Sequence, residues 1–126
     1  MKPTSPHTAA RQRAAENSRL WLIERTNGQC DWCARAGCHE HHVANGQNRG
    51  LSLGKLFAVC WLCLDCHNEL HAMPKRVAVC IGLALIRYHR ADVYDLEKFY
   101  KLIGRRYPSE EDIEAWFGRM CNARTP

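Results

Sequence analysis

The chain has 126 residues, and its 46% of hydrophobic residues, with four Trp, favour a folded protein over a disordered one. Its length predicts a single domain over residues 1–126, and its net charge of +5 suits an anionic partner. The longest apolar run, residues 77–86, is too short to span a membrane, and no apolar signal segment opens the sequence. We therefore expect a cytoplasmic protein without a membrane partner.

The N-terminal part is expected to be helical. Residues 9–26 lack Pro and Gly and are rich in helix formers, and Asn27-Gly28 then predicts a helix end. We assign the apolar side of this helix to all or some of its hydrophobic residues: Ala10, Ala14, Leu20, Trp21 and Ile23.

The next part changes character. Residues 28–63 contain several glycines and cysteines and two short runs with strand character, residues 41–44 and 56–60. A loop over residues 45–55 separates the two runs. This pattern predicts a two-stranded ribbon with a long connection.

Helical patterns return after the ribbon. Residues 64–73 place Leu and His side chains three and four positions apart, and residues 75–90 are apolar on nearly every side, which predicts a buried helix. The expected fold class is therefore α+β. A small core of two strands and one helix, residues 28–73, lies between the N-terminal helix and a helical C-terminal extension over residues 75–121.

Two further helices are predicted from their start signals. Asp92 or Asp95 is expected to cap a helix that reaches about Arg106. Ser109 and Asp112 resemble a capping box that begins a last helix.

Two Cys-x2-Cys units predict a structural zinc site. Cys30 and Cys33 form the first unit, and Cys63 and Cys66 form the second. Each unit lets two thiolates reach one ion, so the two units together supply the tetrahedral ligand set of a structural Zn²⁺. Disulfides are rare in cytosolic proteins, where clustered cysteines more often bind metal. A structural Zn²⁺ is thus the first expected cofactor.

The chain has eight cysteines, and the other four leave alternatives open. Cys60 lies close before Cys63 and Cys38 close after Cys33, so other ligand sets exist. We interpret the four additional residues as ordinary buried or free thiols: Cys38, Cys60, Cys80 and Cys121. A disulfide-framed or redox protein is the alternative if the cysteines pair with one another.

Four histidines predict a second metal site. His67 and His71 are four positions apart on the expected helix, so both imidazoles project from one face and can share an ion. His41 and His42 are neighbours on the expected strand, where adjacent side chains point to opposite faces. If His41 turns toward the helix as a third ligand, His42 points elsewhere and is available as a base.

The cysteine and histidine motifs follow one another in a specific order: Cys30-x2-Cys33, His41-His42-Val43 and Cys63-x2-Cys66-His67-x3-His71. Over residues 28–73 this arrangement resembles the HNH (ββα-metal) endonucleases, and its histidines resemble those of the colicin nuclease domains. The resemblance implies a ββα fold that holds a metal between the second strand and the helix. It also implies a metal-dependent endonuclease that hydrolyses phosphodiester bonds of nucleic acid, with DNA as the expected substrate.

The resemblance assigns roles to the histidines as well. By position, His42 matches the general base of the family, and His41, His67 and His71 match the ligands of its catalytic metal. Compact proteins of this family are common in phages and mobile elements, so we expect the protein in a bacterial or phage-infected host cell.

Phosphodiester hydrolysis needs an activated water and stabilisation of charge on the phosphate. Imidazole suits the first task because histidine side chains ordinarily titrate near neutral pH. A divalent ion bound by three protein groups suits the second, because it keeps open positions for the substrate. Imidazole ligands are compatible with Zn²⁺, Ni²⁺ or Mn²⁺, and the resemblance also allows Mg²⁺.

Basic residues near the expected site are candidate nucleic-acid contacts. Arg49 and Lys55 lie in the loop between the strands and could hold flanking phosphates, or could be solvated loop charges. The next helix carries residues that form either a further basic track or a solvated face: Lys75, Arg76, Arg87 and Arg90.

One position departs from the family pattern. The family usually has an Asn shortly before the second cysteine pair, where this chain has Phe57 and Ala58. The alternative function is therefore a non-catalytic, zinc-stabilised module that binds DNA or a protein.

Overall fold

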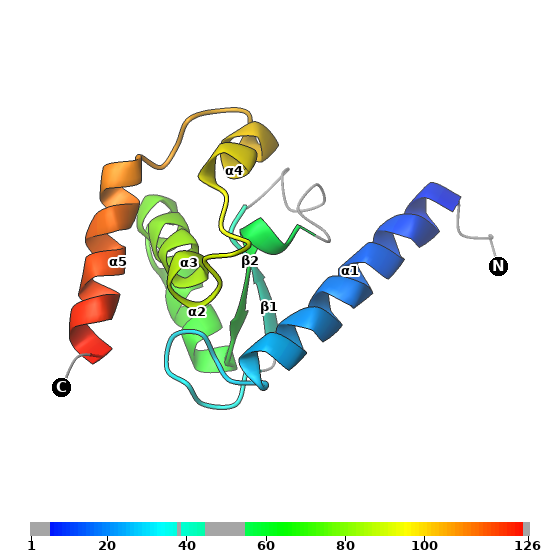
Figure 1. Ribbon diagram of the computed structural model, residues 1–126, viewed down its shortest axis with the longest axis horizontal. Helices are drawn as coiled ribbons and strands as arrows, with labels where there is room; N and C mark the ends of the chain where they lie inside the picture. Colours follow the sequence, from blue (N-terminus) through cyan, green and yellow to red (C-terminus); the bar gives the residue numbers. More distant parts are fainter. Residues whose placement is uncertain (1–5, 38, 45–54, 125–126) are drawn as a thin grey trace.

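The computed structural model describes residues 6–37, 39–44 and 55–124 and combines helices with a small sheet (Figure 1). Within these residues, β1 (His39–His42) pairs antiparallel with β2 (Val59–Leu62), and the 3-10 helix η3 (Leu56–Ala58) precedes β2. The α-helices are α1 (Pro6–Thr26), α2 (Leu64–Ala72), α3 (Lys75–His89), α4 (Leu96–Ile103) and α5 (Glu110–Arg124). The expected α+β class is confirmed.

Both strands lie a few residues away from the ranges expected from the sequence. The range expected for the second strand was wrong because residues 56–58 form the 3-10 helix η3, in which the Ala58 N–H donates to the Lys55 carbonyl at 3.0 Å. The ladder therefore begins at Val59. On the other strand the pairing reaches back to His39, which lies opposite Leu62.

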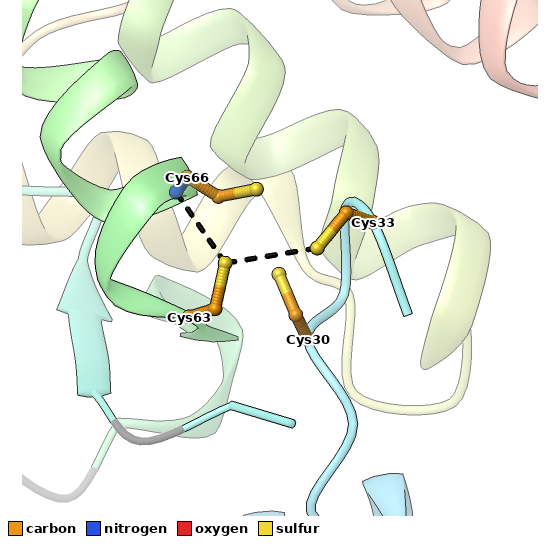
Figure 2. A group of neighbouring side chains, drawn as sticks. All are labelled: Cys30, Cys33, Cys63 and Cys66. Carbon is orange, nitrogen blue, oxygen red and sulfur yellow. Dashed lines mark hydrogen bonds between the residues drawn. The ribbon is translucent and has the colours of Figure 1, made fainter. Parts of the chain in front are cut away.

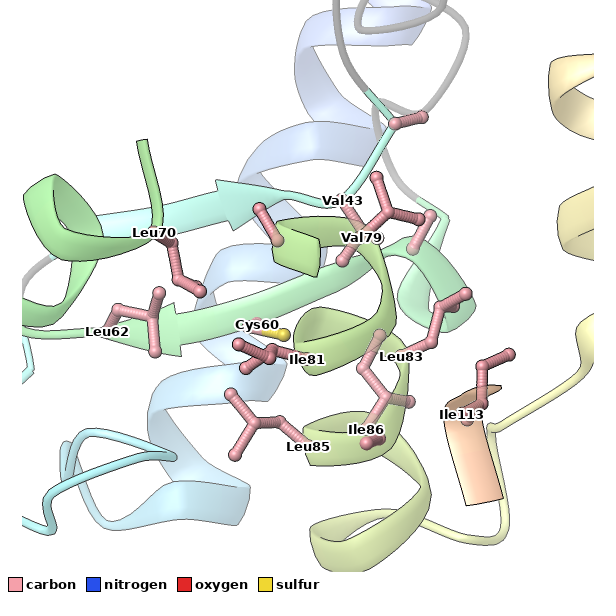
Figure 3. Close-up of a cluster of buried hydrophobic side chains, with 14 of the residues drawn as sticks. Val43, Cys60, Leu62, Leu70, Val79, Ile81, Leu83, Leu85, Ile86 and Ile113 are labelled. Carbon is pink, nitrogen blue, oxygen red and sulfur yellow. The ribbon is translucent and has the colours of Figure 1, made fainter. Parts of the chain in front are cut away.

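The two faces of the ribbon pack against different helices. Successive side chains of a strand point to opposite faces, and Val59 and Trp61 contact Leu22 of α1 on one face. Cys60 and Leu62 belong to the main core on the other face, beside α3 (Figure 3). The ribbon is thus enclosed on both sides.

Helix α3 is the centre of the core, as its sequence predicts. Residues 78–86 are all buried, and α3 packs between the ribbon and α5 (Figures 1 and 3). Gly82 allows α3 to approach the ribbon, because a Cβ at this position would lie 2.8 Å from Cγ2 of Val43. The Cys60 thiol donates to the Gly82 carbonyl at 3.2 Å. Neither α3 nor another helix in the described ranges combines the length and apolarity needed to cross a membrane.

The buried side of α1 differs from the expected one. Ser18 and Leu22 are buried, whereas Leu20 is 55% and Ile23 is 38% exposed. Ala10 and Ala14 are exposed as well, and Trp21 alone of the expected set packs against the ribbon. The expectation is thus met by Trp21 and not by the other four residues, because α1 meets the ribbon near its C-terminal end, at a point that periodicity does not reveal (Figure 1).

The helix starts in the C-terminal extension follow the sequence signals. The Asp95 carboxylate accepts from the Lys98 N–H at 3.0 Å at the start of α4. Ser109 Oγ accepts from the Asp112 N–H at 3.2 Å at the start of α5. Helix α4 ends before the expected Arg106, because Gly104 adopts the left-handed conformation with φ +77°.

Candidate metal centres

The four expected cysteine ligands converge on one point (Figure 2). The sulfurs of Cys30, Cys33, Cys63 and Cys66 all lie within 4.8 Å of one another, and Cys33 Sγ is 3.6 Å from Cys63 Sγ. Cys33 is exposed and the other three are buried. Four thiols at this spacing form a ligand set that could hold a structural zinc ion. No disulfide joins cysteines in the described part of the chain.

The second pair of thiols is placed by the start of α2. Cys63 is the N-cap residue, and its sulfur accepts from the Cys66 N–H at 3.5 Å. This backbone hydrogen bond lowers the pKa of Cys63 to about 7. At Cys63 the start of the helix thus favours a thiolate, which is the form that binds zinc. Burial raises the pKa of Cys66 and Cys30 instead, so these two thiols would lose their protons when an ion binds.

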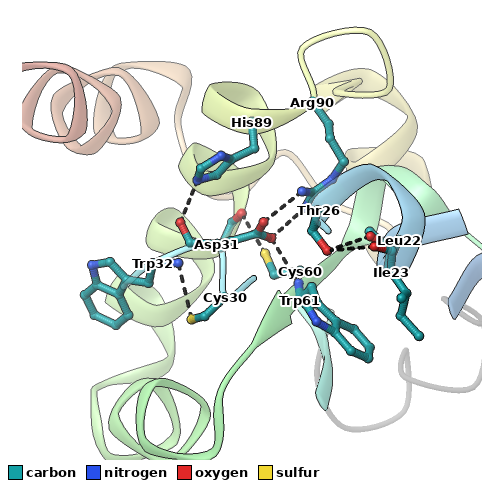
Figure 4. A network of polar contacts seen from close by, with 11 residues as sticks. Leu22, Ile23, Thr26, Cys30, Asp31, Trp32, Cys60, Trp61, His89 and Arg90 are labelled. Atoms are coloured by element: carbon teal, nitrogen blue, oxygen red, sulfur yellow. Dashed lines mark hydrogen bonds and ion pairs between the residues drawn. The ribbon is translucent and has the colours of Figure 1, made fainter. Parts of the chain in front are cut away.

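The first pair is held by backbone hydrogen bonds and by Asp31. The Trp32 N–H donates to Cys30 Sγ at 3.4 Å. The turn from Cys30 to Cys33, here called the first cysteine knuckle, is closed by the Ala34 N–H, which donates to the Cys30 carbonyl at 3.0 Å. Asp31, between the two cysteines, points into the protein, where Arg90 contacts both of its carboxylate oxygens at 2.9 and 2.7 Å (Figure 4). Neither Asp31 nor Arg90 is predicted from the sequence to support this site.

Three of the four expected histidines also converge. His41 on β1 and His67 on α2 approach with their Nδ1 atoms 3.2 Å apart, and His71 Nε2 lies 3.1 Å from His67 Nε2. One ligand atom from each residue can be chosen so that all three lie within 4.8 Å of one another. The juxtaposition expected of a three-histidine metal site is therefore present.

The environment of His41 favours its neutral form. His41 is 3% exposed, whereas His71 is on the surface. Burial, together with the neighbouring His67 and His71, lowers the pKa of His41 to about 3. A neutral imidazole keeps a nitrogen lone pair for a metal ion. The buried His41 is thus available as a ligand, and the three residues form a group that could hold a metal ion.

His39 is a neighbour that the sequence analysis missed. Its ring stacks on His67, with the centroids 5.2 Å apart and the planes 20° from parallel. His39 precedes His41 by two positions on β1, so strand alternation places both on the same face. That period-two spacing is the signal in the sequence that indicates His39, although the expected strand begins only at His41.

His42 lies on the other face of β1. It pairs with Val59, which packs toward α1, whereas His41 pairs with Cys60 on the side of α3. Residues directly opposite in an antiparallel ladder share a face. The two histidines therefore point apart, as the sequence predicts.

The structure brings Lys55 to a different place from the histidine cluster. Lys55 lines a hollow of about 410 Å³ with Asp92 and Lys98. The residue that does lie beside His41 and His71 is Lys75, in a hollow of about 180 Å³. The sequence did not reveal this place, because loops vary in the path they take over the surface, and the role of Lys55 as a nucleic-acid contact stays a prediction. Arg49, the other expected contact, lies outside the described residues.

The position of the missing family Asn is occupied by apolar packing. Ala58 is fully buried, and Phe57 packs against the main core. Asn45 and Asn48, which occur earlier in the loop, lie outside the described residues. Residues 55–62, directly before the second cysteine pair, contain no Asn or Gln.

The chain was compared with known proteins, and no protein-family model, curated protein or solved structure matches it.

Proposed function

We propose that the chain is a metal-dependent endonuclease of the HNH (ββα-metal) type that hydrolyses phosphodiester bonds of nucleic acid, with DNA as its first expected substrate. The observation that carries the proposal is the convergence of His41 from β1 with His67 and His71 from α2, directly beside a four-cysteine cluster. The strand–strand–helix order of these elements agrees with the resemblance of the motifs to that family.

The residues present fit a catalytic divalent ion. Three nitrogen donors lie within reach of one ion, the buried one is neutral, and the exposed His71 leaves one side of the cluster accessible. His41, His67 and His71 would hold the ion, which could be Zn²⁺, Ni²⁺, Mn²⁺ or Mg²⁺. When bound, such an ion stabilises charge on the phosphate and on the leaving oxygen.

His42 is the proposed general base. In-line displacement at phosphorus places the attacking water and the leaving oxygen on opposite sides. A base on one face of β1 and a ligand set on the other face are compatible with this requirement. In this mechanism the His42 imidazole takes the proton of the attacking water, and Lys75, beside His41 and His71, attracts the phosphate.

Nicking of supercoiled plasmid in the presence of Mg²⁺, Mn²⁺, Ni²⁺ or Zn²⁺ tests the proposal. We expect cleavage by the unchanged chain and a loss of at least about 10²-fold in His42→Ala, as is typical for removal of a positioned base. Glu40→Gln is the matched control, because Glu40 lies on the same face of β1 as His42 and the change keeps the side-chain shape. Equal cleavage by His42→Ala and Glu40→Gln would contradict the assigned base.

A second candidate function is a non-catalytic, zinc-stabilised module that binds DNA or a protein. The apolar packing of Phe57 and Ala58 favours it, because neither of these residues carries an amide that could help orient a base. Binding of DNA without cleavage under every metal would select this second function.

A further inference from the structure

A hollow with a cationic rim lies beside the start of α3. Its volume is about 260 Å³, far above the ~10–15 Å³ that a cavity needs to hold one water molecule, so a ring-sized group fits. The apolar floor includes Val43, which follows β1 directly, and Phe99 of α4, both of them buried. The rim is formed by exposed cations: Lys75, Arg76 and Arg105.

An aromatic ring completes the hollow. Tyr107 lines it, with the guanidinium carbons of Arg76 and Arg105 lying 5.7 and 5.2 Å from the ring centroid. No carboxylate lines the hollow. Among the described residues, no carboxylate forms an ion pair with either arginine. The cations of the rim are therefore not neutralised within this part of the chain.

The other two arginines considered for a basic track do not contribute to it. Arg87 pairs with Glu114 on α5, and Arg90 is buried against Asp31. Lys75, in contrast, lines both the cationic hollow and the smaller hollow beside His41 and His71. A cationic path thus connects the histidine cluster with Tyr107.

We propose that the cationic hollow binds one nucleotide of the substrate strand, with the base against Tyr107 and the flanking phosphates on Arg76 and Arg105. The strand then passes Lys75 to the histidine cluster. An apolar floor with an aromatic ring is what a base recognises, and guanidinium groups that pair with no described carboxylate are what phosphates recognise. This inference rests on the proposed function, because it takes a nucleic acid as the ligand.

Binding of a labelled 12-nucleotide single strand to the zinc-loaded chain, measured by fluorescence anisotropy at several salt concentrations without added metal, tests the phosphate contacts. Arg105→Ala should lower the slope of log affinity against log salt by about 0.7, the value for one lost phosphate contact on a single strand. Arg106→Ala is the matched control, because Arg106 is exposed and paired with Glu97 outside the hollow. Equal slopes for the two variants would overturn the phosphate assignment.

The base contact is tested with Tyr107→Leu and with a strand of equal length that carries no bases. Loss of stacking should weaken binding of the normal strand about fivefold or more. The same substitution should leave binding of the base-free strand unchanged. Tyr107→Phe keeps the ring and should bind as the unchanged chain does, which separates lost stacking from misfolding. If Tyr107→Leu and Tyr107→Phe bind the normal strand equally well, the base assignment is wrong.

Failure of the proposed nucleotide site in these binding experiments is distinguishable from failure of the proposed nuclease function in the nicking assay. A chain that cuts plasmid, and whose Arg105 and Tyr107 variants bind like the unchanged chain, keeps its nuclease function and loses the nucleotide site. A chain that cuts nothing, but loses strand binding in these variants, keeps the site and loses the nuclease function. Absence of strand binding by the unchanged chain at low salt would also overturn the site.

Discussion

Asp31 and Arg90 form a buried bidentate ion pair that links the first cysteine knuckle to the end of α3. Both side chains are 2% exposed, and the Asp31 carboxylate also accepts from the Trp61 N–H of β2 at 3.0 Å (Figure 4). The Asp31 carbonyl lies 2.6 Å from Nε2 of His89, the last residue of α3. One aspartate thus joins the knuckle, the ribbon and the central helix.

Removal of one partner of this pair should be strongly destabilising. Arg90→Met leaves the Asp31 carboxylate buried without its cation, and we expect a loss of about 3–5 kcal/mol in the free energy of unfolding. Asp31→Asn combined with Arg90→Met should recover part of that loss, because no buried charge is left uncompensated. Urea unfolding followed by Trp fluorescence, at a constant excess of zinc, measures both. A loss below about 1 kcal/mol for Arg90→Met would mean that the pair behaves like an exposed one.

Zinc should be required for the central region to fold. Each chain should contain one Zn²⁺ held by the four clustered cysteines, so chelation or Cys63→Ser should lower the melting temperature sharply. Cys121→Ser is the control, because Cys121 lies on α5 outside the cluster. Elemental analysis and thermal unfolding provide the measurements. An unchanged melting curve in metal-free protein would refute the structural role of zinc.

The histidine cluster should bind a second divalent ion independently of zinc. His71→Ala removes a surface ligand, so affinity for Mn²⁺ or Ni²⁺ should fall at least roughly tenfold while zinc content and fold are retained. His39→Ala removes an imidazole that stacks on His67 without belonging to the cluster, and its effect should be smaller. Titration calorimetry compares the three chains. Identical binding curves for His71→Ala and the unchanged chain would exclude this site.

Two glycines in helices should respond oppositely to replacement by alanine. Gly82→Ala would place a methyl group 2.8 Å from the stiff, buried side chain of Val43. The overpacking cost of about 1–3 kcal/mol should exceed the gain in helix propensity of about 1 kcal/mol. Gly118→Ala meets no atom within 4 Å, so it should stabilise the protein by that propensity gain. Denaturation midpoints give the comparison, and stabilisation by Gly82→Ala would show that α3 can move away from Val43.

Features set by short spacings along the chain were predictable from the sequence. The two cysteine units, the pairing of His67 with His71 and the caps at Asp95 and Ser109 all depend on residues within one helical turn or one knuckle. At such distances covalent geometry and helical periodicity leave few alternatives. The buried character of α3 followed in the same way from its apolar composition.

Features that join distant segments were decided only by the tertiary structure. Asp31 and Arg90 are 59 positions apart, and nothing local indicates that their charges meet inside the protein. The packing of α2 against β1 brings the rings of His39 and His67 together, and the crossing point of α1 selects Leu22 rather than Leu20 or Ile23 for burial. These outcomes depend on how whole elements pack, because packing determines which side chains leave water and which partners they meet there.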